Sequence, residues 1–178
     1  MARTVFVEIG FAASSKEIAR RAGVSEGVLF QRFTTKEELF FAAMIPPPVD
    51  LSALFEHSNI EGLALLEKIT FSMVGYFRST LPVLLPLMSH PSFRFEEFAR
   101  RQPDAALVTL RRELMQFMVQ QKRDGRIGTV DPGAAALVIW SIANTVAFFE
   151  QLGAHDGKMP EAIVRAAVEC LWTGMKPE

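Results

Sequence analysis

The sequence has little that would support secretion, membrane insertion or disulfide bonding. Its 178 residues include a single cysteine, Cys170, so an internal disulfide is excluded. The first residues lack the continuous apolar segment of a signal peptide. The longest apolar stretch, residues 134–149, is interrupted by polar side chains and does not reach the ~18–20 residues of a membrane span. These absences predict a cytoplasmic protein with no membrane partner.

Patterns that carry catalysis are also missing. The three histidines are His57, His90 and His155, and each stands alone beside an expected loop. None has the spacing to another histidine or to Cys170 that a metal site requires. The sequence has no glycine-rich phosphate loop and no strand-like alternation. It therefore predicts an all-α protein that is not an enzyme and needs no cofactor.

Charge gives only weak evidence about partners, whereas the apolar content is more informative. The net charge is −1, with a net +1 over residues 1–44 and a net −3 over residues 127–178. This asymmetry is too small to predict nucleic-acid binding by itself. Hydrophobic residues make up 49% of the chain, which is high for a soluble monomer of this size. Apolar surface is therefore expected to be buried against a partner or around a ligand.

The most informative stretch is residues 14–36, SSKEIARRAGVSEGVLFQRFTTK. Ser14 begins a capping box at the start of one short helix, and Ser25 caps a second. Gly23 supplies the turn between them, with Val24 expected to be buried behind it. Two short helices joined by a glycine-containing turn predict a helix-turn-helix.

Proline residues predict the division of the rest of the chain. Pro46, Pro47 and Pro48 end the next helix and mark a boundary between a three-helix head, 1–45, and a helical body, 46–178. Pro82, Pro86 and Pro91 are expected to break the following segment into short pieces. Body helices are predicted at 51–57, 60–80, 93–101, 104–124, 132–152 and 160–174.

The sequence resembles the TetR (tetracycline-repressor) family of bacterial transcription regulators. The residues that carry the resemblance are Gly10-Phe11-Ala12-Ala13, the run from Ile18 to Gly27, Phe30, Phe33 and Lys36-Glu37-Glu38-Leu39. The resemblance implies an all-α fold in which an N-terminal helix-turn-helix head precedes a ligand-binding and dimerisation body. It also implies a homodimer that binds a double-stranded DNA operator and responds to a small effector.

Four departures from the family pattern bear on DNA binding. Val28, Phe30 and Arg32 stand where family members usually have threonine, tyrosine and histidine. The family hydroxyls commonly bond DNA phosphates, which Val28 and Phe30 cannot do, whereas Arg32 could supply a charge-assisted contact. The family's first helix normally begins upstream of the point that matches Met1. About three turns, or about 10 residues, of that helix are therefore expected to be missing from this head.

The predicted DNA contacts lie mainly on the two helices of the motif. Gly27 allows close backbone approach to phosphate, Gln31 could pair with an adenine edge, and Phe30 could touch a thymine methyl. Lys36 is placed beside a helix N-terminus that would meet a phosphate. Arg20 and Arg21 are expected to be solvated or salt-bridged. The full predicted set is Ser15, Lys16, Ser25, Glu26, Gly27, Phe30, Gln31, Arg32 and Lys36.

The body is rich in phenylalanine and methionine, which are core residues by default and would equally line a ligand pocket. Family resemblance favours a pocket between the predicted helices 60–80, 104–124 and 132–152. Few polar groups lie on those faces, so a lipophilic effector is expected, with Asn144 as a polar anchor. The predicted ligand-binding residues are Phe71, Met73, Phe77, Met88, Phe117, Met118, Trp140, Asn144 and Phe148.

The predicted helix 132–152 carries no charge between Asp131 and Glu150, so it is expected to lie between its own core and a partner. The last helix adds small side chains that allow close approach. Two such helices from each chain would form a two-fold, four-helix interface. The predicted dimer residues are Ala135, Val138, Ile139, Ile142, Val146, Phe149, Ile163, Ala166, Ala167 and Cys170.

These observations predict a ligand-responsive DNA-binding regulator, expected to be a repressor that a lipophilic small molecule releases from a palindromic operator. The alternative is a dimeric ligand-binding or interaction protein whose head no longer binds DNA. DNA affinity separates the two interpretations.

Overall fold

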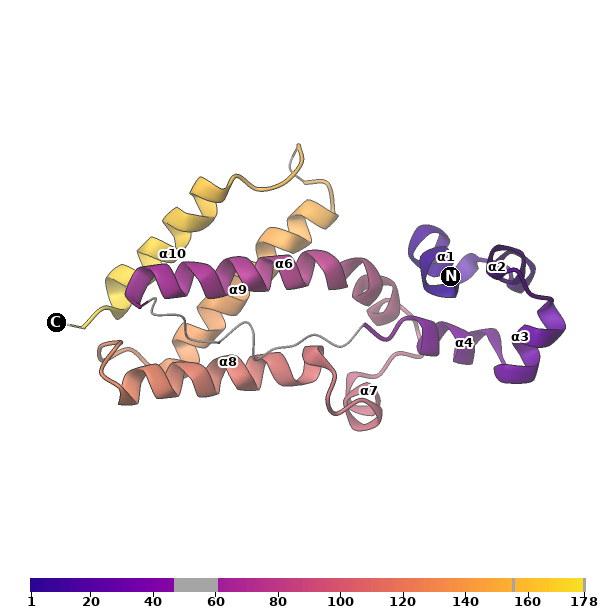
Figure 1. Ribbon diagram of the computed structural model, residues 1–178, viewed down its shortest axis with the longest axis horizontal. Helices are drawn as coiled ribbons and strands as arrows, with labels where there is room; N and C mark the ends of the chain where they lie inside the picture. Colours follow the sequence, from indigo (N-terminus) through magenta and orange to yellow (C-terminus); the bar gives the residue numbers. More distant parts are fainter. Residues whose placement is uncertain (47–60, 155, 178) are drawn as a thin grey trace. The chain divides into compact units, whose positions relative to one another are not determined.

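The computed structural model describes residues 1–46, 61–154 and 156–177, and over these residues every regular element is helical (Figure 1). The predicted all-α class, with a helix-turn-helix head followed by a helical body, is confirmed. The helix predicted at 51–57 lies outside the described residues, as do His57 and His155.

The chain forms two compact units. We call residues 1–47 and 80–101 the head unit, and residues 48–79 and 102–178 the body unit. The head unit therefore includes a segment, 80–101, that the sequence analysis assigned to the body. The predicted domain boundary after residue 45 stays a prediction.

Short helices build the N-terminal part of the head unit. They are α1 (Ala2–Ile9), the 3-10 helix η1 (Gly10–Ala12), α2 (Ser15–Ala22), α3 (Glu26–Arg32) and α4 (Lys36–Ala43). Phe6 and Phe40 are fully buried, and their rings meet edge to face with centroids 5.0 Å apart. Ile18 and Leu29 bring α2 and α3 into this core. The small apolar core leaves the outer faces of α2 and α3 in solvent.

Side-chain caps begin each helix of the motif. The backbone N–H of Glu17 donates to Ser14 Oγ at 3.1 Å, that of Val28 to Ser25 Oγ at 3.3 Å, and that of Glu38 to Thr35 Oγ1 at 3.1 Å. These bonds satisfy amides that a helix start leaves unpaired. They fix where α2, α3 and α4 begin, and the sequence predicted the caps of α2 and α3.

The turn between α2 and α3 follows the predicted chemistry with one exception. Gly23 has φ 69° and ψ 27°, a left-handed conformation that a side chain would disfavour, and it ends α2. Val24 was expected to be buried, but 39% of it is exposed. The prediction for Val24 was wrong because a head this small buries only one face of its turn.

The long helix α6 (Gly62–Met88) corrects the expected effect of the prolines. The sequence analysis ended a helix near Thr80, yet α6 continues through Pro82 and Pro86. Each proline removes one helical hydrogen bond. Leu81, Leu84 and Leu87 are nevertheless buried, so apolar packing on one helix face offsets that loss. α6 contributes its first part to the body unit and its last turns to the head unit.

Three further helices complete the body unit. They are α8 (Ala106–Arg123), α9 (Pro132–Gln151) and α10 (Glu161–Met175). α9 packs against both α8 and α10, as Figure 1 shows for the orange and yellow segments. Asp131 caps α9 by accepting the N–H of Ala134 at 2.8 Å, with Pro132 in the first turn. Met73, Phe77 and Ile139 are among the fully buried core side chains of the body unit.

A partly buried ion pair ties α6 to α9 within the body unit. Arg78 donates from Nε and Nη2 to the two carboxylate oxygens of Glu150, at 2.7 and 2.8 Å. The backbone N–H of Met159 also donates to Glu150, at 2.7 Å. The guanidinium of Arg78 holds the pKa of the Glu150 carboxyl below its ordinary value. Glu150 and Arg78 therefore form a charged junction between α6 and α9.

Within the described residues, α9 is the one helix long and apolar enough to cross a membrane. Its 18-residue window has a mean hydropathy of 1.5, and 33% of that window is buried inside the protein. The sequence analysis expected no such stretch. A helix with its own core on one side and a partner on the other passes the same test, because neither surface requires charge.

Candidate nucleic-acid interface

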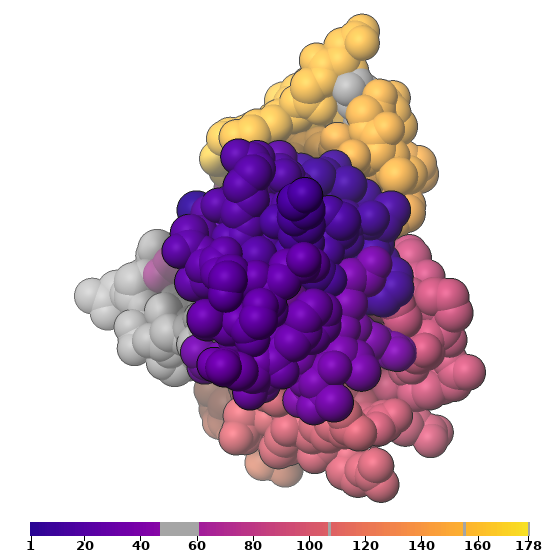
Figure 2. Space-filling view, turned by 90° about the vertical axis from the view of Figure 1, so that its right-hand side faces the viewer, coloured from indigo at the N-terminus to yellow at the C-terminus, as the bar shows by residue number. Residues whose placement is uncertain are grey.

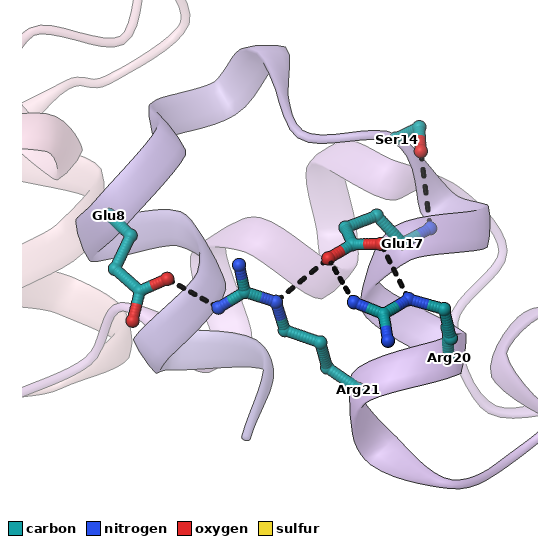
Figure 3. A network of polar contacts seen from close by, with 5 residues as sticks. All are labelled: Glu8, Ser14, Glu17, Arg20 and Arg21. Atoms are coloured by element: carbon teal, nitrogen blue, oxygen red, sulfur yellow. Dashed lines mark hydrogen bonds and ion pairs between the residues drawn. The ribbon is translucent and has the colours of Figure 1, made fainter.

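An ionic network on the head fixes α2 against α1 (Figure 3). Arg20 donates from Nε and Nη2 to the two carboxylate oxygens of Glu17, at 2.8 and 2.7 Å. Arg21 donates from Nε to Glu17 at 2.8 Å and reaches Glu8 on α1 with Nη1. The hydrogen bonds from Arg20 and then Arg21 lower the pKa of Glu17 from 4.5 to about 2. The expectation that both arginines are salt-bridged is confirmed.

The short helix α3 carries the exposed face that would meet a nucleic acid. Figure 2 shows the surface of residues 1–46 in indigo and purple. α3 buries Leu29 alone, so its remaining side chains lie on the surface. Its seven residues span about 10 Å at 1.5 Å per residue, which fits the ~12 Å width of a major groove.

Two apolar side chains on this face are unusually accessible. Val28 is 51% exposed and Phe30 is 44% exposed. Both lie on the helix that also presents Gln31 and Arg32 to solvent. A methyl-bearing thymine edge would cover such side chains, whereas a phosphate would find no hydrogen-bond donor on them. These two side chains of α3 are therefore suited to base edges more than to the DNA backbone.

The remaining predicted DNA contacts fall into two groups. Lys16, Ser25, Glu26 and Gly27 are exposed, and Ser15 is half-buried at the first turn of α2. Lys36 behaves differently, because its ammonium donates to the carbonyl oxygens of Phe11 at 2.9 Å and Ala13 at 3.4 Å. Its Nζ also lies 4.3 Å from the centroid of the Phe11 ring. Lys36 thus braces η1, a role that the sequence analysis did not predict.

A buried histidine anchors the segment after α6 in the head unit. The His90 ring lies 4.4 Å from the Phe11 ring and 5.2 Å from the rings of Phe40 and Phe41, centroid to centroid. Its Nδ1 accepts the N–H of Ser92 at 3.2 Å. The sequence analysis treated His90 as a lone loop residue. The proline-rich neighbourhood gave no sign that the ring would enter the aromatic core of the head.

Arg3 also stabilises the head unit, a role that the sequence analysis did not predict. Its guanidinium donates to the carbonyl oxygens of Ala43 at 2.8 Å and Ile45 at 2.6 Å, where α4 ends. A cation at a helix C-terminus satisfies orphan carbonyls and interacts favourably with the helix dipole. Arg3, His90 and the ionic network together hold the helices beneath α3.

The predicted ligand-binding residues lie in different settings within the described part of the chain. Phe117 and Met118 line a recess in the body unit. Met73 and Phe77 are core residues, and the Phe77 and Trp140 rings meet at 4.9 Å between centroids. Phe71, Asn144 and Phe148 are half-buried, whereas Met88 is 51% exposed.

The predicted dimer residues divide by exposure. Ala135, Ile139 and Val146 are buried in the core of the body unit, so they have no surface to offer a partner. The exposed face of α9 instead carries Leu137, Val138 and Phe149, of which Val138 and Phe149 belong to the predicted set. On α10, Ile163, Ala166 and Cys170 are exposed, whereas Ala167 is half-buried, as is Ile142 on α9.

Comparisons with known proteins agree with this geometry. Residues 1–43 match the family model of the bacterial regulatory proteins, tetR family. The chain matches none of the curated proteins at a significant level. Three solved structures illustrate the shared fold. They are a TetR family transcriptional regulator from Pseudomonas syringae pv. tomato str. DC3000, the TetR family transcriptional regulator PfmR from Thermus thermophilus, and the ketosteroid transcriptional regulator KstR2 of Mycobacterium tuberculosis.

The likeness extends along nearly the whole of each chain. The Pseudomonas protein is 22% identical over 98% of this chain and 92% of its own, with a TM-score of 0.68. PfmR is 21% identical over 97% and 95%, with a TM-score of 0.65. KstR2 is 14% identical over 99% and 92%, with a TM-score of 0.61. Residues 1–43 therefore match the N-terminal domain of the tetR family of bacterial regulatory proteins, and the chain as a whole has the fold of the TetR-family regulators that it resembles.

Proposed function

We propose that this protein is a cytoplasmic transcriptional repressor that binds a palindromic operator as a homodimer and is released by a lipophilic small molecule. The observation that carries the proposal is the exposed, capped helix α3 on a head that an ionic network and an aromatic core hold rigid. A pre-organised reading helix lowers the cost of binding, because little has to be ordered on contact.

In this proposal α3 enters the major groove and the residues around it take separate roles. Gln31 pairs with an adenine edge and Phe30 contacts a thymine methyl. Lys16 and Arg32 contact phosphates, and the hydroxyls of Ser15 and Ser25 add neutral hydrogen bonds to the backbone. Glu26 and Gly27 lie on the same exposed stretch, where the lack of a side chain at Gly27 admits a phosphate.

Dimerisation supplies the second reading helix. The exposed faces of α9 and α10 present Leu137, Val138, Phe149 and Ile163, each at least 41% exposed. Apolar side chains grouped in this way favour contact with a second copy of the chain. A two-fold dimer presents two α3 helices to major grooves that are ~34–36 Å apart on one face of the duplex.

Release would follow from a change in that spacing. An effector bound within the body would tilt α4, the helix that follows the reading head, and move the two α3 helices away from successive grooves. The effector must bind the tilted form more tightly than the DNA-bound form, since only differential affinity shifts the equilibrium.

A selection experiment tests the proposal. The purified full chain is incubated with a pool of random DNA duplexes at low salt, and bound duplexes are amplified and sequenced. We expect enrichment of a palindrome whose half-site centres are about one helical turn, or a multiple of it, apart. An unenriched pool would leave the head without a reading function.

Two substitutions separate base reading from phosphate contact. Gln31→Ala is expected to relax the preference at one base pair of each half-site, at a cost of about 1–3 kcal/mol. Lys16→Ala is expected to weaken the binding of all duplexes by a similar factor and to reduce the salt dependence of that binding. Gln151→Ala, at the exposed end of α9, is the matched control and should leave the selected sequence unchanged.

A second candidate function is favoured by one observation on the same helix. Val28 and Phe30 place two exposed apolar groups where a hydroxyl would bond phosphate. In that case the protein is a dimeric ligand-binding or interaction protein whose head does not bind DNA. The selection experiment distinguishes the two, because this alternative predicts no enriched sequence while the dimer persists.

A further inference from the structure

A recess in the body unit brings together the start of α6, the end of α8, the loop that follows α8, and α10. Its enclosed space is about 20 Å³, and the whole recess with its open mouth is about 280 Å³. Six apolar side chains, each less than a tenth exposed, form most of the lining: Leu65, Leu66, Ile69, Phe117, Met118 and Ile127. All of these residues belong to the body unit.

One polar side chain in this lining has a buried hydrogen-bond donor without an acceptor in the part of the chain that the structure describes. Gln121, near the end of α8, is 4% exposed and lines the recess. Its Nε2 is buried and, among the described residues, has no hydrogen-bond partner. A buried amide donor left without an acceptor carries its full desolvation cost. Such a group at the wall of a recess indicates an acceptor that the protein itself does not provide.

A single water molecule fits the enclosed space but matches its chemistry poorly. Buried waters typically make about three hydrogen bonds to polar groups. The polar side-chain groups of this lining belong to Gln121, Arg126 and Trp172, and each of the three carries an N–H donor. A water that accepts from them would face apolar side chains with its own hydrogens. An oxygen that only accepts, attached to an apolar body, suits the recess better.

The charge around Arg126 argues against an anionic ligand. Its guanidinium lies 3.7 Å from a carboxylate oxygen of Glu61 and 3.9 Å from one of Asp124. Two carboxylates therefore already neutralise one cation at the mouth of the recess. An added carboxylate would meet a local excess of negative charge, so a neutral acceptor is favoured.

The lining of the recess also contains an aromatic side chain that lies close to a glycine. A Cβ built on Gly62 would lie 3.3 Å from Cζ2 of Trp172, and Gly62 has φ +61°. Only glycine permits both this backbone conformation and this approach. Trp172, half-buried on α10, thus closes one side of the recess and would sense any molecule that enters.

From these contacts we infer that the recess binds a neutral, mainly apolar molecule with a carbonyl-type acceptor, which receives a hydrogen bond from Gln121 Nε2. The enclosed space of about 20 Å³ admits only the acceptor atom, so the apolar body of the molecule would lie in the open mouth, within the whole recess of about 280 Å³. The inference rests on the proposed function only in assigning that molecule the role of effector.

The test uses three eight-carbon probes that differ in one feature. They are 2-octanone, with a neutral acceptor; octanoate, with an anionic one; and n-octane, with none. The protein is the full chain carrying Trp140→Phe, so that the fluorescence of Trp172 is the sole tryptophan signal. We expect saturable binding of 2-octanone, and binding of octanoate at least roughly 10-fold weaker because the site lacks an uncompensated cation.

Gln121→Met keeps the length of the side chain and removes the amide. We expect it to weaken 2-octanone binding by about 3- to 10-fold and to leave n-octane binding unchanged. It should also raise the melting temperature of the unliganded protein, because an unmatched buried donor is removed. Gln120→Met is the matched control, since Gln120 bonds Asp124 at 2.8 Å instead of facing the recess.

Each result decides the inference. Equal binding of 2-octanone by Gln121→Met and the parent protein, absence of saturable binding, or a lower melting temperature for Gln121→Met would overturn it. DNA binding is measured separately on the same proteins. If 2-octanone binds through Gln121 but leaves the affinity for DNA unchanged, the inference stands and the proposed release by an effector fails.

Discussion

The head and the body of this protein differ in what determines their geometry. In the head, α2, α3 and α4 each begin with a side-chain cap, and an ionic network fixes α2 against α1. In the body, α9 has a side-chain cap whereas α8 and α10 have none. Apolar packing along long helices determines the arrangement there. Caps and ion pairs between near neighbours in sequence therefore specify the geometry of the head unit. Side-chain packing between distant residues specifies that of the body unit.

The largest expected effect is a loss of stability in the head unit that leaves the stability of the body unit unchanged. Phe40→Ala removes a fully buried ring that contacts Phe6, Phe11 and His90, and should destabilise the head unit by about 3–5 kcal/mol. Both tryptophans lie in the body unit. In urea, circular dichroism should therefore show an early partial loss of helix while tryptophan fluorescence keeps its midpoint. An equal shift of both signals would show that the units unfold together.

A smaller effect is expected at the exposed face of the body. Val138→Glu places a charge on the 41%-exposed side chain of α9, and two-fold symmetry would bring two such charges close together. The dimer should weaken by about 2–3 kcal/mol, which sedimentation measures as a shift toward monomer. Ile9→Glu is the control, since Ile9 is 44% exposed on α1. An unchanged dimer for Val138→Glu would exclude this face as the interface.

The next effect concerns the charged junction of the body. Glu150→Gln removes one half of the pair with Arg78, whose side chain is 32% exposed, and should cost about 1–2 kcal/mol of body stability. Because its folded pKa is lowered, the Glu150 carboxylate stabilises the body above its unfolded pKa, and this stabilisation is lost as pH falls through the folded pKa. The fluorescence midpoint of the variant should therefore depend less on pH in acid. An unchanged pH dependence would contradict this.

The smallest effect is expected at the exposed network of the head. The pKa of Glu17 is lowered from 4.5 to about 2, so its contribution is present above pH 4.5 and is lost as pH falls toward 2. Glu17→Gln should flatten the acid dependence of the early circular dichroism transition over that range. Glu26→Gln, which removes a carboxylate outside the network, should not. Equal behaviour of the two variants would show that Arg20 and Arg21 do not stabilise Glu17.

This contrast also explains which parts of the fold were predictable. Ser14, Gly23 and Asp131 act through near neighbours in sequence, so their roles followed from spacing. Pro82 and Pro86 were predicted to break a helix, and that prediction was wrong. Their local cost is offset by the buried leucines of α6, whose partners come from distant parts of the chain. Information of that kind is not carried by local spacing.

The candidate sites divide in the same way. The exposure of Phe30 and Gln31 followed from the helix-turn-helix pattern. Lys36 was placed correctly on α4, but its bonds to the carbonyls of Phe11 and Ala13 depend on how η1 folds back. Gln121 was missed altogether, because a glutamine near the end of a charged helix gives no sign that its amide is buried.

The central claim is that the head reads DNA, and a titration of the purified protein tests it most directly. The duplex from upstream of the protein's own coding sequence is compared with a random duplex of equal length, at low salt and without effector. We expect the upstream duplex to bind at least about 10³-fold more tightly, as specific sites do relative to non-specific ones. Equal affinity for the two duplexes would contradict the claim and favour a dimer whose head does not read DNA.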